Sequence, residues 1–281
     1  MSIDKQQDYF LNDDVIYHYT NLYTALEYIL DNRIDNRTLR LSPRGNSIDP
    51  VENWDDYLPM GVDFANSKKS YDDKEIKDIY NYLKNRLLKA KQVCFCMNNS
   101  SESKLEHTRE ETMNRYGFLK PRMWSQYADS FRGVCLAFSK NKLKENNPKL
   151  VPKTIIYAQL HKLPKKKIDF YAKDLDDLGI EKCKKKYQDK LDEFIFSKHQ
   201  DYFGENEFRF CSFSEYEYDY LDISHSLKGI FFIENKISEF AKKSLLSYGR
   251  EYKVNPLGIK WGGFGIGFNI YTNSGNKSSL E

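Results

Sequence analysis

The feature that most constrains the fold is the stretch GENEFRFCSF at residues 204–213. As a β-strand it alternates strictly, because successive side chains of a strand point to opposite faces. One face would carry Glu205, Glu207, Arg209 and Cys211, and the other face would carry two phenylalanines. The phenylalanine face predicts a hydrophobic core on that side of a sheet.

The charged face of this stretch has two interpretations. Carboxylates two residues apart on one strand face lie about 7 Å from each other. Their repulsion favours a raised pKa on one of them, and the guanidinium of Arg209 can offset it. The stretch is either an exposed edge strand with an ion pair or one wall of a ligand site.

Composition sets broad limits on the class of protein. The chain has 281 residues, of which 40% are hydrophobic, so it can bury a large core. The formal net charge is +3, so any contact with nucleic acid must come from local patches. No apolar run approaches a membrane span, and the opening residues MSIDKQQDYF do not resemble a leader. The five cysteines have no C-x-x-C spacing, which predicts reduced thiols, a cytoplasmic location and no zinc site.

Hydrophobic periodicity predicts strands and helices along the whole chain. Strands are expected at residues 15–20, 39–41, 92–97, 134–138, 153–160, 204–213 and 227–233, with a final hairpin in GIKWGGFGIGFNIYT. Helices are expected at residues 21–30 and 71–90 and in a segment that begins at Pro121. Another long helix is expected to end near residue 197, and the last helix at residues 237–248, with Gly249 as its stop. Because the chain has no repeats and no composition break, residues 1–281 are expected to form one α+β domain with a mixed or antiparallel sheet and inserted helices. The nucleotide-binding motifs G-x-x-x-x-G-K-[ST] and G-x-G-x-x-G are absent.

The stretch VIYHYT, residues 15–20, is a strand that runs straight into a helix. His18 and Thr20 share one face of the strand, and Tyr17 and Tyr19 share the other. Thr20 is placed to cap the helix, so His18 is expected beside a helix N-terminus, where phosphate or polar groups can bind. The alternative is a core histidine with satisfied hydrogen bonds.

Two further segments allow both a structural and a functional interpretation. Helical spacing after Pro121 puts Trp124 and Tyr127 on one face, either as core residues or with Tyr127 stacking on a flat ring. Lysines gather at residues 162–167 and 182–186, as a solvated face or as a site for an anionic partner such as RNA or DNA.

Four motifs in order carry a family resemblance. They are YHYT before a helix, the loop Asp49-Pro50-Val51-Glu52, W-x-x-Y-A-D followed by GVCLAF, and E-x-E-F-R. Together they resemble the bacterial domain-of-unknown-function family numbered 2971, from about residue 15 to residue 233. The usual family loop reads Asn-Asp-Pro, whereas this chain has Ile48 before Asp49.

A more distant resemblance links the chain to ADP-ribosyltransferases of the H-Y-E type, including the DarT-like toxins. It implies an ADP-ribosyltransferase-like fold, NAD as substrate and no metal. His18 would bind the NAD ribose, and Tyr19 or Thr20 would hold the nicotinamide side. Tyr127, with Trp124 on the same helix face, would stack on the nicotinamide ring, and Tyr116 is the substitute for that role. Glu207 would be the catalytic carboxylate with Glu205 as its E-x-E partner, and Arg209 would keep the pair ionised.

The function expected from this resemblance is an NAD-consuming transferase. It would be a bacterial toxin or antiphage effector that modifies nucleic acid or protein. One alternative is a non-catalytic module that senses a nucleotide or a nucleic-acid end. Another is a nuclease, either metal-free or with Mg²⁺ held by the carboxylates and His18. The enzyme interpretation requires His18 and Glu207 to lie on adjacent central strands and to face one cleft, and it fails if they lie on opposite faces of the sheet.

Overall fold

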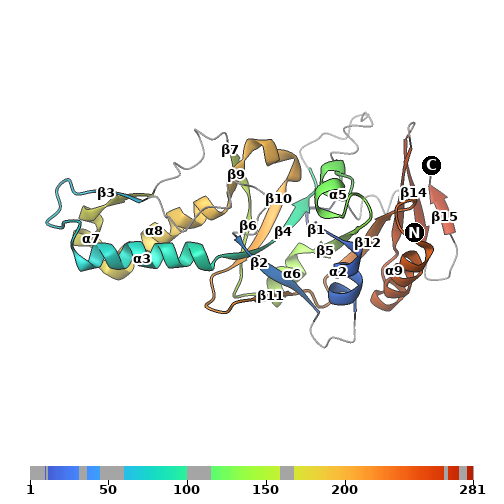
Figure 1. Ribbon diagram of the computed structural model, residues 1–281, viewed down its shortest axis with the longest axis horizontal. Helices are drawn as coiled ribbons and strands as arrows, with labels where there is room; N and C mark the ends of the chain where they lie inside the picture. Colours follow the sequence, from blue (N-terminus) through green and yellow to red (C-terminus); the bar gives the residue numbers. More distant parts are fainter. Residues whose placement is uncertain are drawn as a thin grey trace.

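The fold is built on a large, mostly antiparallel sheet. The structure is a computed structural model that describes residues 10, 12–31, 37–44, 60–99, 115–158, 168–262, 265–271 and 277–280. Figure 1 shows an elongated molecule, with the sheet in the middle, a helical arm on one side and the C-terminal strands with α9 on the other. The predicted α+β class with a mixed sheet is confirmed.

Eleven strands of the described residues form the main sheet. In order across it lie β11 (Asp219–Asp222), β2 (Thr38–Pro43), β4 (Lys91–Met97), β1 (Val15–Thr20), β5 (Val134–Ser139), β12 (Leu227–Ile233), β13 (Leu257–Gly262), β14 (Gly265–Tyr271) and β15 (Lys277–Leu280). Two more strands, β10 (Glu207–Ser212) and β6 (Val151–Thr154), continue from β4. Neighbouring strands are antiparallel except for β12 and β13, which are parallel.

The sheet splits at β4. Along one edge of this strand, β10 pairs with every residue from Lys91 to Cys96. Along the other edge, β1 pairs only at Cys96 and Met97, and β2 pairs only at Lys91 and Gln92. Between these contacts β1 and β2 diverge, so the middle of β4 faces a gap in the sheet.

The two faces of the sheet carry separate hydrophobic cores. On one face, Ile16, Phe95, Phe208 and Phe210 pack with residues of η1 (Ala25–Ile29), α6 (Lys140–Asn146) and α9 (Glu239–Tyr252). The other face is covered by residues 116–119 and by α5 (Pro121–Tyr127), whose Trp124 is fully buried. Pro121 occupies the first turn of α5, as predicted.

The arm has its own core between two long helices. α3 (Lys74–Lys89) and α8 (Ile180–Ile195) lie side by side, with α7 (Ala172–Leu178) and the parallel pair β3 (Met60–Asp63) and β8 (Ile168–Tyr171) at the far end (Figure 1). Arg86 of α3 forms a two-pronged ion pair with Asp192 of α8, at 3.0 and 2.9 Å. The chain returns to the sheet through β9 (Ser197–His199), which pairs with β7 (Ile156–Ala158), and η3 (Gln200–Glu205).

The expectation for residues 204–213 is partly wrong. Glu205 ends η3, and Asn206 takes a left-handed conformation with φ of 45°, so the strand begins only at Glu207. The strand is not an exposed edge, since β10 lies between β4 and β6 and all its residues are buried.

Two predicted helix boundaries are also wrong. Asn21, and not Thr20, caps the helix after β1, because its side chain accepts a hydrogen bond from the Thr24 amide at 2.7 Å. α9 continues past Gly249 to Tyr252, and Lys253, with φ of 57°, ends it. Gly249 permits close packing instead, since a Cβ there would lie 2.4 Å from the Pro256 side chain.

Some expectations concern residues outside the described part of the chain. They include the Asp49-Pro50-Val51-Glu52 loop and the lysines at 162–167. Within the described part, no helix has the length and apolar character needed to cross a membrane. All five cysteines lie in described segments and are free thiols.

Candidate functional site

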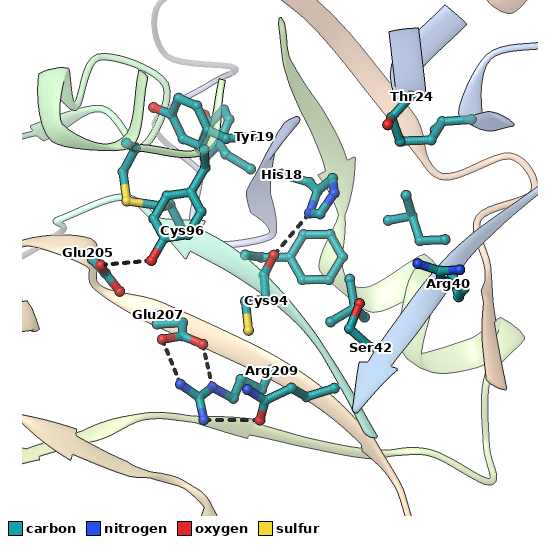
Figure 2. A pocket seen from close by; sticks show the side chains of 18 of the residues that line it. His18, Tyr19, Thr24, Arg40, Ser42, Cys94, Cys96, Glu205, Glu207 and Arg209 are labelled. Carbon is teal, nitrogen blue, oxygen red and sulfur yellow. Dashed lines mark hydrogen bonds and ion pairs between the residues drawn. The ribbon is translucent and has the colours of Figure 1, made fainter. Parts of the chain in front are cut away.

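A cavity of about 860 Å³ opens at the split in the sheet. Its floor is β4, from which Gln92, Cys94 and Cys96 point to the same face as Glu207 and Arg209 of β10, because paired residues share a face. Figure 2 shows Glu205, Glu207 and Arg209 on one side and Thr24, Arg40 and Ser42 on the other. His18 and Cys94 lie between these two groups (Figure 2). The cavity thus has an acidic end and a second end built from β2 and the first helix.

The acidic end is a buried network of four charged side chains. Arg209 binds both oxygens of Glu207 with Nε and Nη2, and its Nη1 donates to Gln92 Oε1 at 3.1 Å. Lys198 of β9 donates to Glu205 Oε2 at 2.7 Å and to Glu207 Oε2 at 3.3 Å. All four side chains are nearly inaccessible to water. Each buried carboxylate therefore has a cation partner, as burial of charge requires.

The conformation of Asn206 brings the two carboxylates together. A left-handed residue reverses the chain between the end of η3 and the start of β10, so both flanking side chains reach Lys198. Asn206 is held by hydrogen bonds from its Nδ2 to Asn98 O and Asn99 Oδ1, at 2.8 and 2.9 Å. Asparagine tolerates this backbone region better than most residues.

The two carboxyl groups have opposite pKa shifts. Burial is the largest influence on Glu207 and would raise its pKa, but Arg209 and Lys198 outweigh it and lower the pKa from 4.5 to about 2. Burial raises the pKa of Glu205, and Lys198 offsets this only in part. The sequence predicted one raised pKa and a stabilising Arg209. The structure assigns the raised pKa to Glu205 and pairs Arg209 with Glu207.

His18 lines the cavity from the other face of the sheet. Tyr17 is paired with Cys96 and so lies on the face of Glu207, which puts His18 on the opposite face. Its Nδ1–H donates to the Cys94 carbonyl at 3.0 Å, at the unpaired edge of β4. Burial lowers the pKa of His18, so its neutral form is favoured and Nε2 remains an acceptor. The expectation that His18 and Glu207 face each other is wrong, although both residues border one cavity through the split.

The predicted aromatic residues separate into cavity and core. Tyr127 is half-buried at the acidic end, where its hydroxyl donates to Glu205 Oε1 at 3.4 Å. Tyr19 also lines the cavity, but its hydroxyl is committed to the Gly117 carbonyl at 2.6 Å. Trp124 is a core residue, with its ring nitrogen bound to Phe118 O at 2.8 Å. Neither Trp124 nor the substitute candidate Tyr116 lines the cavity, and Thr20 does not line it either.

Comparison with known proteins finds a family similarity for the segment that contains one part of this site. A family model described as "Protein of unknown function (DUF2971)" matches residues 123–210. The match covers less than half of the chain, so the similarity to this family is shown for this segment. No curated protein and no solved structure matches the chain. The resemblance predicted from W-x-x-Y-A-D and E-x-E-F-R is therefore confirmed over the segment that contains both motifs.

The DUF2971 segment supplies the acidic end of the cavity. Tyr127, Lys198, Glu205, Glu207 and Arg209 all fall within residues 123–210. His18 and the residues of β2 lie before it in the chain. The second end is thus built from residues outside the matched segment.

Sequence reasoning missed several cavity residues. Lys198 stood in no recognised motif, and its role depends on the turn through η3. At the second end, the cavity is lined by Thr24, Tyr28, Arg40, Ser42 and Tyr220. The alternation of Arg40 and Ser42 with buried Leu39 and Leu41 was the available signal, since it marks one polar face of β2.

The residues present suit an organic ligand with both polar and flat groups. Acceptors are available on Glu205 and His18, aromatic rings on Tyr127 and Tyr28, and a cation on Arg40. Among the described residues, no group of three histidine, cysteine, aspartate or glutamate side chains has the arrangement of a metal site.

Proposed function

We propose that the cavity binds NAD and that the chain is an NAD-consuming, ADP-ribosyltransferase-like enzyme. The observation that supports this most strongly is that His18, Tyr127 and the Glu205–Glu207 pair all border the same cavity. Its volume of about 860 Å³ suits a ligand of dinucleotide size. In this proposal the enzyme acts in the cytoplasm, as a toxin or antiphage effector, on a nucleic acid or protein acceptor.

The reaction breaks the bond between the nicotinamide nitrogen and ribose C1′. The bonding electrons leave with nicotinamide, and positive charge develops on the ribose as in other glycosidic cleavages. An acceptor nucleophile then forms a bond to C1′ and releases its proton. Carboxylates held in a dry site stabilise such a charge effectively, because they are oriented before the reaction begins.

The geometry supports different roles for the two carboxylates. Glu207 already accepts hydrogen bonds from Arg209, Lys198 and the Cys94 side chain, so it supplies fixed negative charge. Among the residues that the structure describes, the hydrogen bond seen at Glu205 Oε1 is the long one from Tyr127, at 3.4 Å, so this oxygen can accept a ribose hydroxyl. Its raised pKa also suits it to take the acceptor's proton. We therefore assign direct contact with substrate to Glu205 and electrostatic support to Glu207, which modifies the sequence-based roles.

The other residues hold the substrate. Nε2 of neutral His18 accepts a hydrogen bond from a ribose hydroxyl at the split, since Nδ1–H is bound to Cys94 O. The Tyr127 ring packs against the flat nicotinamide group. No step in this scheme uses a metal ion.

A second candidate is a module that binds the nucleotide without turnover. It is favoured by the positions of His18 and Glu207 on opposite sheet faces, and by the cations that already neutralise both carboxylates. Such a module would sense NAD and signal its presence by a change in structure.

The test is nicotinamide release from NAD by the purified chain, with and without nucleic acid and protein acceptors. Wild type should release nicotinamide and label an acceptor, and Glu205→Gln should lose at least 100-fold in rate while NAD still binds. The matched control is Glu193→Gln, an exposed residue of α8, which should match wild type. Binding without release in wild type would favour the sensing module, and absence of binding would overturn both candidates.

A further inference from the structure

The end of the cavity opposite the carboxylates has the features of a phosphate and nucleobase site. Arg40 and Ser42 of β2 and Thr24 of the first helix gather there, as Figure 2 shows. Tyr28 and Tyr220 also line this end and are 56% and 55% exposed. Large tyrosine rings with this exposure beside a cavity are available for stacking on a flat ligand.

The strand register points Arg40 toward the cavity. Tyr220 of β11 pairs with Arg40, and Ser42 pairs with Gln92 on the cavity floor. These side chains therefore share the sheet face that carries Glu207, while Leu39 and Leu41 point into the core on the other face. Polar and aromatic groups on one face of β2 and β11 thus continue the cavity wall.

Arg40 differs from the other cations that line the cavity. Lys198 and Arg209 are both paired with buried carboxylates. Arg40 is exposed, and the contact seen for it in the described part of the chain is with the ring of Tyr218, at 5.4 Å from its centroid. No described carboxylate lies in ion-pair range of Arg40. A guanidinium in this position is suited to bind phosphate oxygens with two parallel hydrogen bonds.

We propose that this end of the cavity binds a nucleoside diphosphate group. Arg40 binds the phosphates with the hydroxyls of Thr24 and Ser42, and Tyr28 or Tyr220 stacks on the base. The identity of the complete ligand rests on the proposed function: in NAD, this group is the adenosine diphosphate half, and the nicotinamide ribose then lies at the acidic end. The cavity would hold the dinucleotide along the floor formed by β4.

The test is calorimetric titration of the full chain with ADP, and separately with nicotinamide mononucleotide. Arg40→Ala should weaken ADP binding at least tenfold, and Tyr220→Ala should weaken it severalfold. Raising the salt concentration should weaken ADP binding to wild type more than to Arg40→Ala. The matched controls are Arg37→Ala and Tyr216→Ala, neither of which lines the cavity, and both should bind ADP as wild type does.

The outcomes separate this inference from the proposed function. ADP binding that depends on Arg40, with no nicotinamide release from NAD, would keep the phosphate site and overturn the transferase. Nicotinamide release with a KM for NAD unchanged in Arg40→Ala would overturn the phosphate site and keep the transferase. No ADP binding by folded wild type, or equal ADP affinity in wild type and Arg40→Ala, would also overturn the phosphate site. Circular dichroism shows whether each variant is folded, which is expected because Arg40 is exposed.

Discussion

At the scale of single residues, Lys198 determines whether two carboxylates can be buried together. Its ammonium group is the cation shared by Glu205 and Glu207. Lys198→Met should lower the free energy of unfolding by about 3–5 kcal/mol, because it leaves a buried charge without compensation. Urea denaturation at pH 7 measures this. Lys185→Met, an exposed change on α8, should stay within about 0.5 kcal/mol of wild type. A loss below about 1 kcal/mol for Lys198→Met would contradict the network.

The lowered pKa of Glu207 makes a second prediction, on acid stability. Its folded value of about 2 lies below its ordinary 4.5, so the ionised form stabilises the fold above pH 4.5. This contribution is lost as the pH falls from 4.5 toward 2 and amounts to roughly 3 kcal/mol. Glu205 acts in the opposite direction, since its raised pKa favours the folded state at low pH and this contribution disappears as the pH rises through that pKa.

The free energies of unfolding of wild type and Glu207→Gln, measured between pH 6 and pH 2, test whether the contribution of Glu207 to stability is lost as the pH falls. The difference in the free energy of unfolding between wild type and Glu207→Gln should become smaller by roughly 3 kcal/mol as the pH falls. Asp201→Asn, an exposed change on η3, serves as the control. A gap that stays constant with pH would mean that Glu207 is not held ionised by Arg209 and Lys198.

Parts of this site follow from local spacing, and other parts do not. Glu207 and Arg209, two residues apart on one strand, were predicted to interact and do. Lys198 joins them only because η3 turns the chain back, and nothing near Lys198 in the sequence specifies that turn. The left-handed Asn206 likewise replaced the expected regular strand at Glu205. His18 shares a face of β1 with Ile16, as predicted, but this is not the face of Glu207. The split that lets His18 border the cavity depends on distant pairings.

At the scale of elements, α5 ends in an unusual turn beside Tyr127. Asp129, Ser130 and Phe131 have positive φ values of 45°, 52° and 71° in succession. Each non-glycine residue in this region costs about 1 kcal/mol or more. Ser130→Gly should therefore raise the free energy of unfolding by about 0.5–1 kcal/mol.

The same substitution in a helix provides the contrast. Ser244→Gly in the middle of α9 should lower the free energy of unfolding by about 0.5–1 kcal/mol, since glycine is unfavourable there. Thermal or urea denaturation of both variants measures the pair. If Ser130→Gly were destabilising to the same extent as Ser244→Gly, the left-handed backbone conformation of Ser130 would be contradicted.

Elements with strong local signals were predicted best. The strands at residues 15–20 and 227–233 have the expected bounds, because each is a short apolar run between turn residues. The end of α9 was missed because Gly249 serves packing against Pro256, a contact between residues that only the fold brings together. The order of the strands was not predicted, since β4 pairs with three strands, β1, β2 and β10, that come from separate parts of the chain.

At the scale of the whole molecule, a change in the core of the arm should lower stability without changing ligand binding in the cavity. The arm core is made by α3, α7 and α8, and its far end lies away from β1 and β4 (Figure 1), two of the strands that line the cavity. Leu83→Ala, at a fully buried position of α3, should lower the free energy of unfolding by about 2–5 kcal/mol. ADP affinity at a temperature where the variant is folded should stay within about twofold of wild type.

The exposed Leu88→Ala on the same helix is the matched control and should affect neither quantity appreciably. A tenfold change in the ADP affinity of Leu83→Ala would mean that the arm controls the site. The path for such control would be β9 and η3, which carry Lys198 and Glu205 from the arm to the cavity.

The most direct test of the central proposal is a crystal structure of Glu205→Gln with NAD bound. We predict the dinucleotide in the split between β1 and β2, with the nicotinamide ring against Tyr127 and its ribose beside residue 205. The phosphates should lie within hydrogen-bond distance of Arg40. A dinucleotide bound elsewhere, or with its adenosine end at the carboxylates, would contradict the proposal.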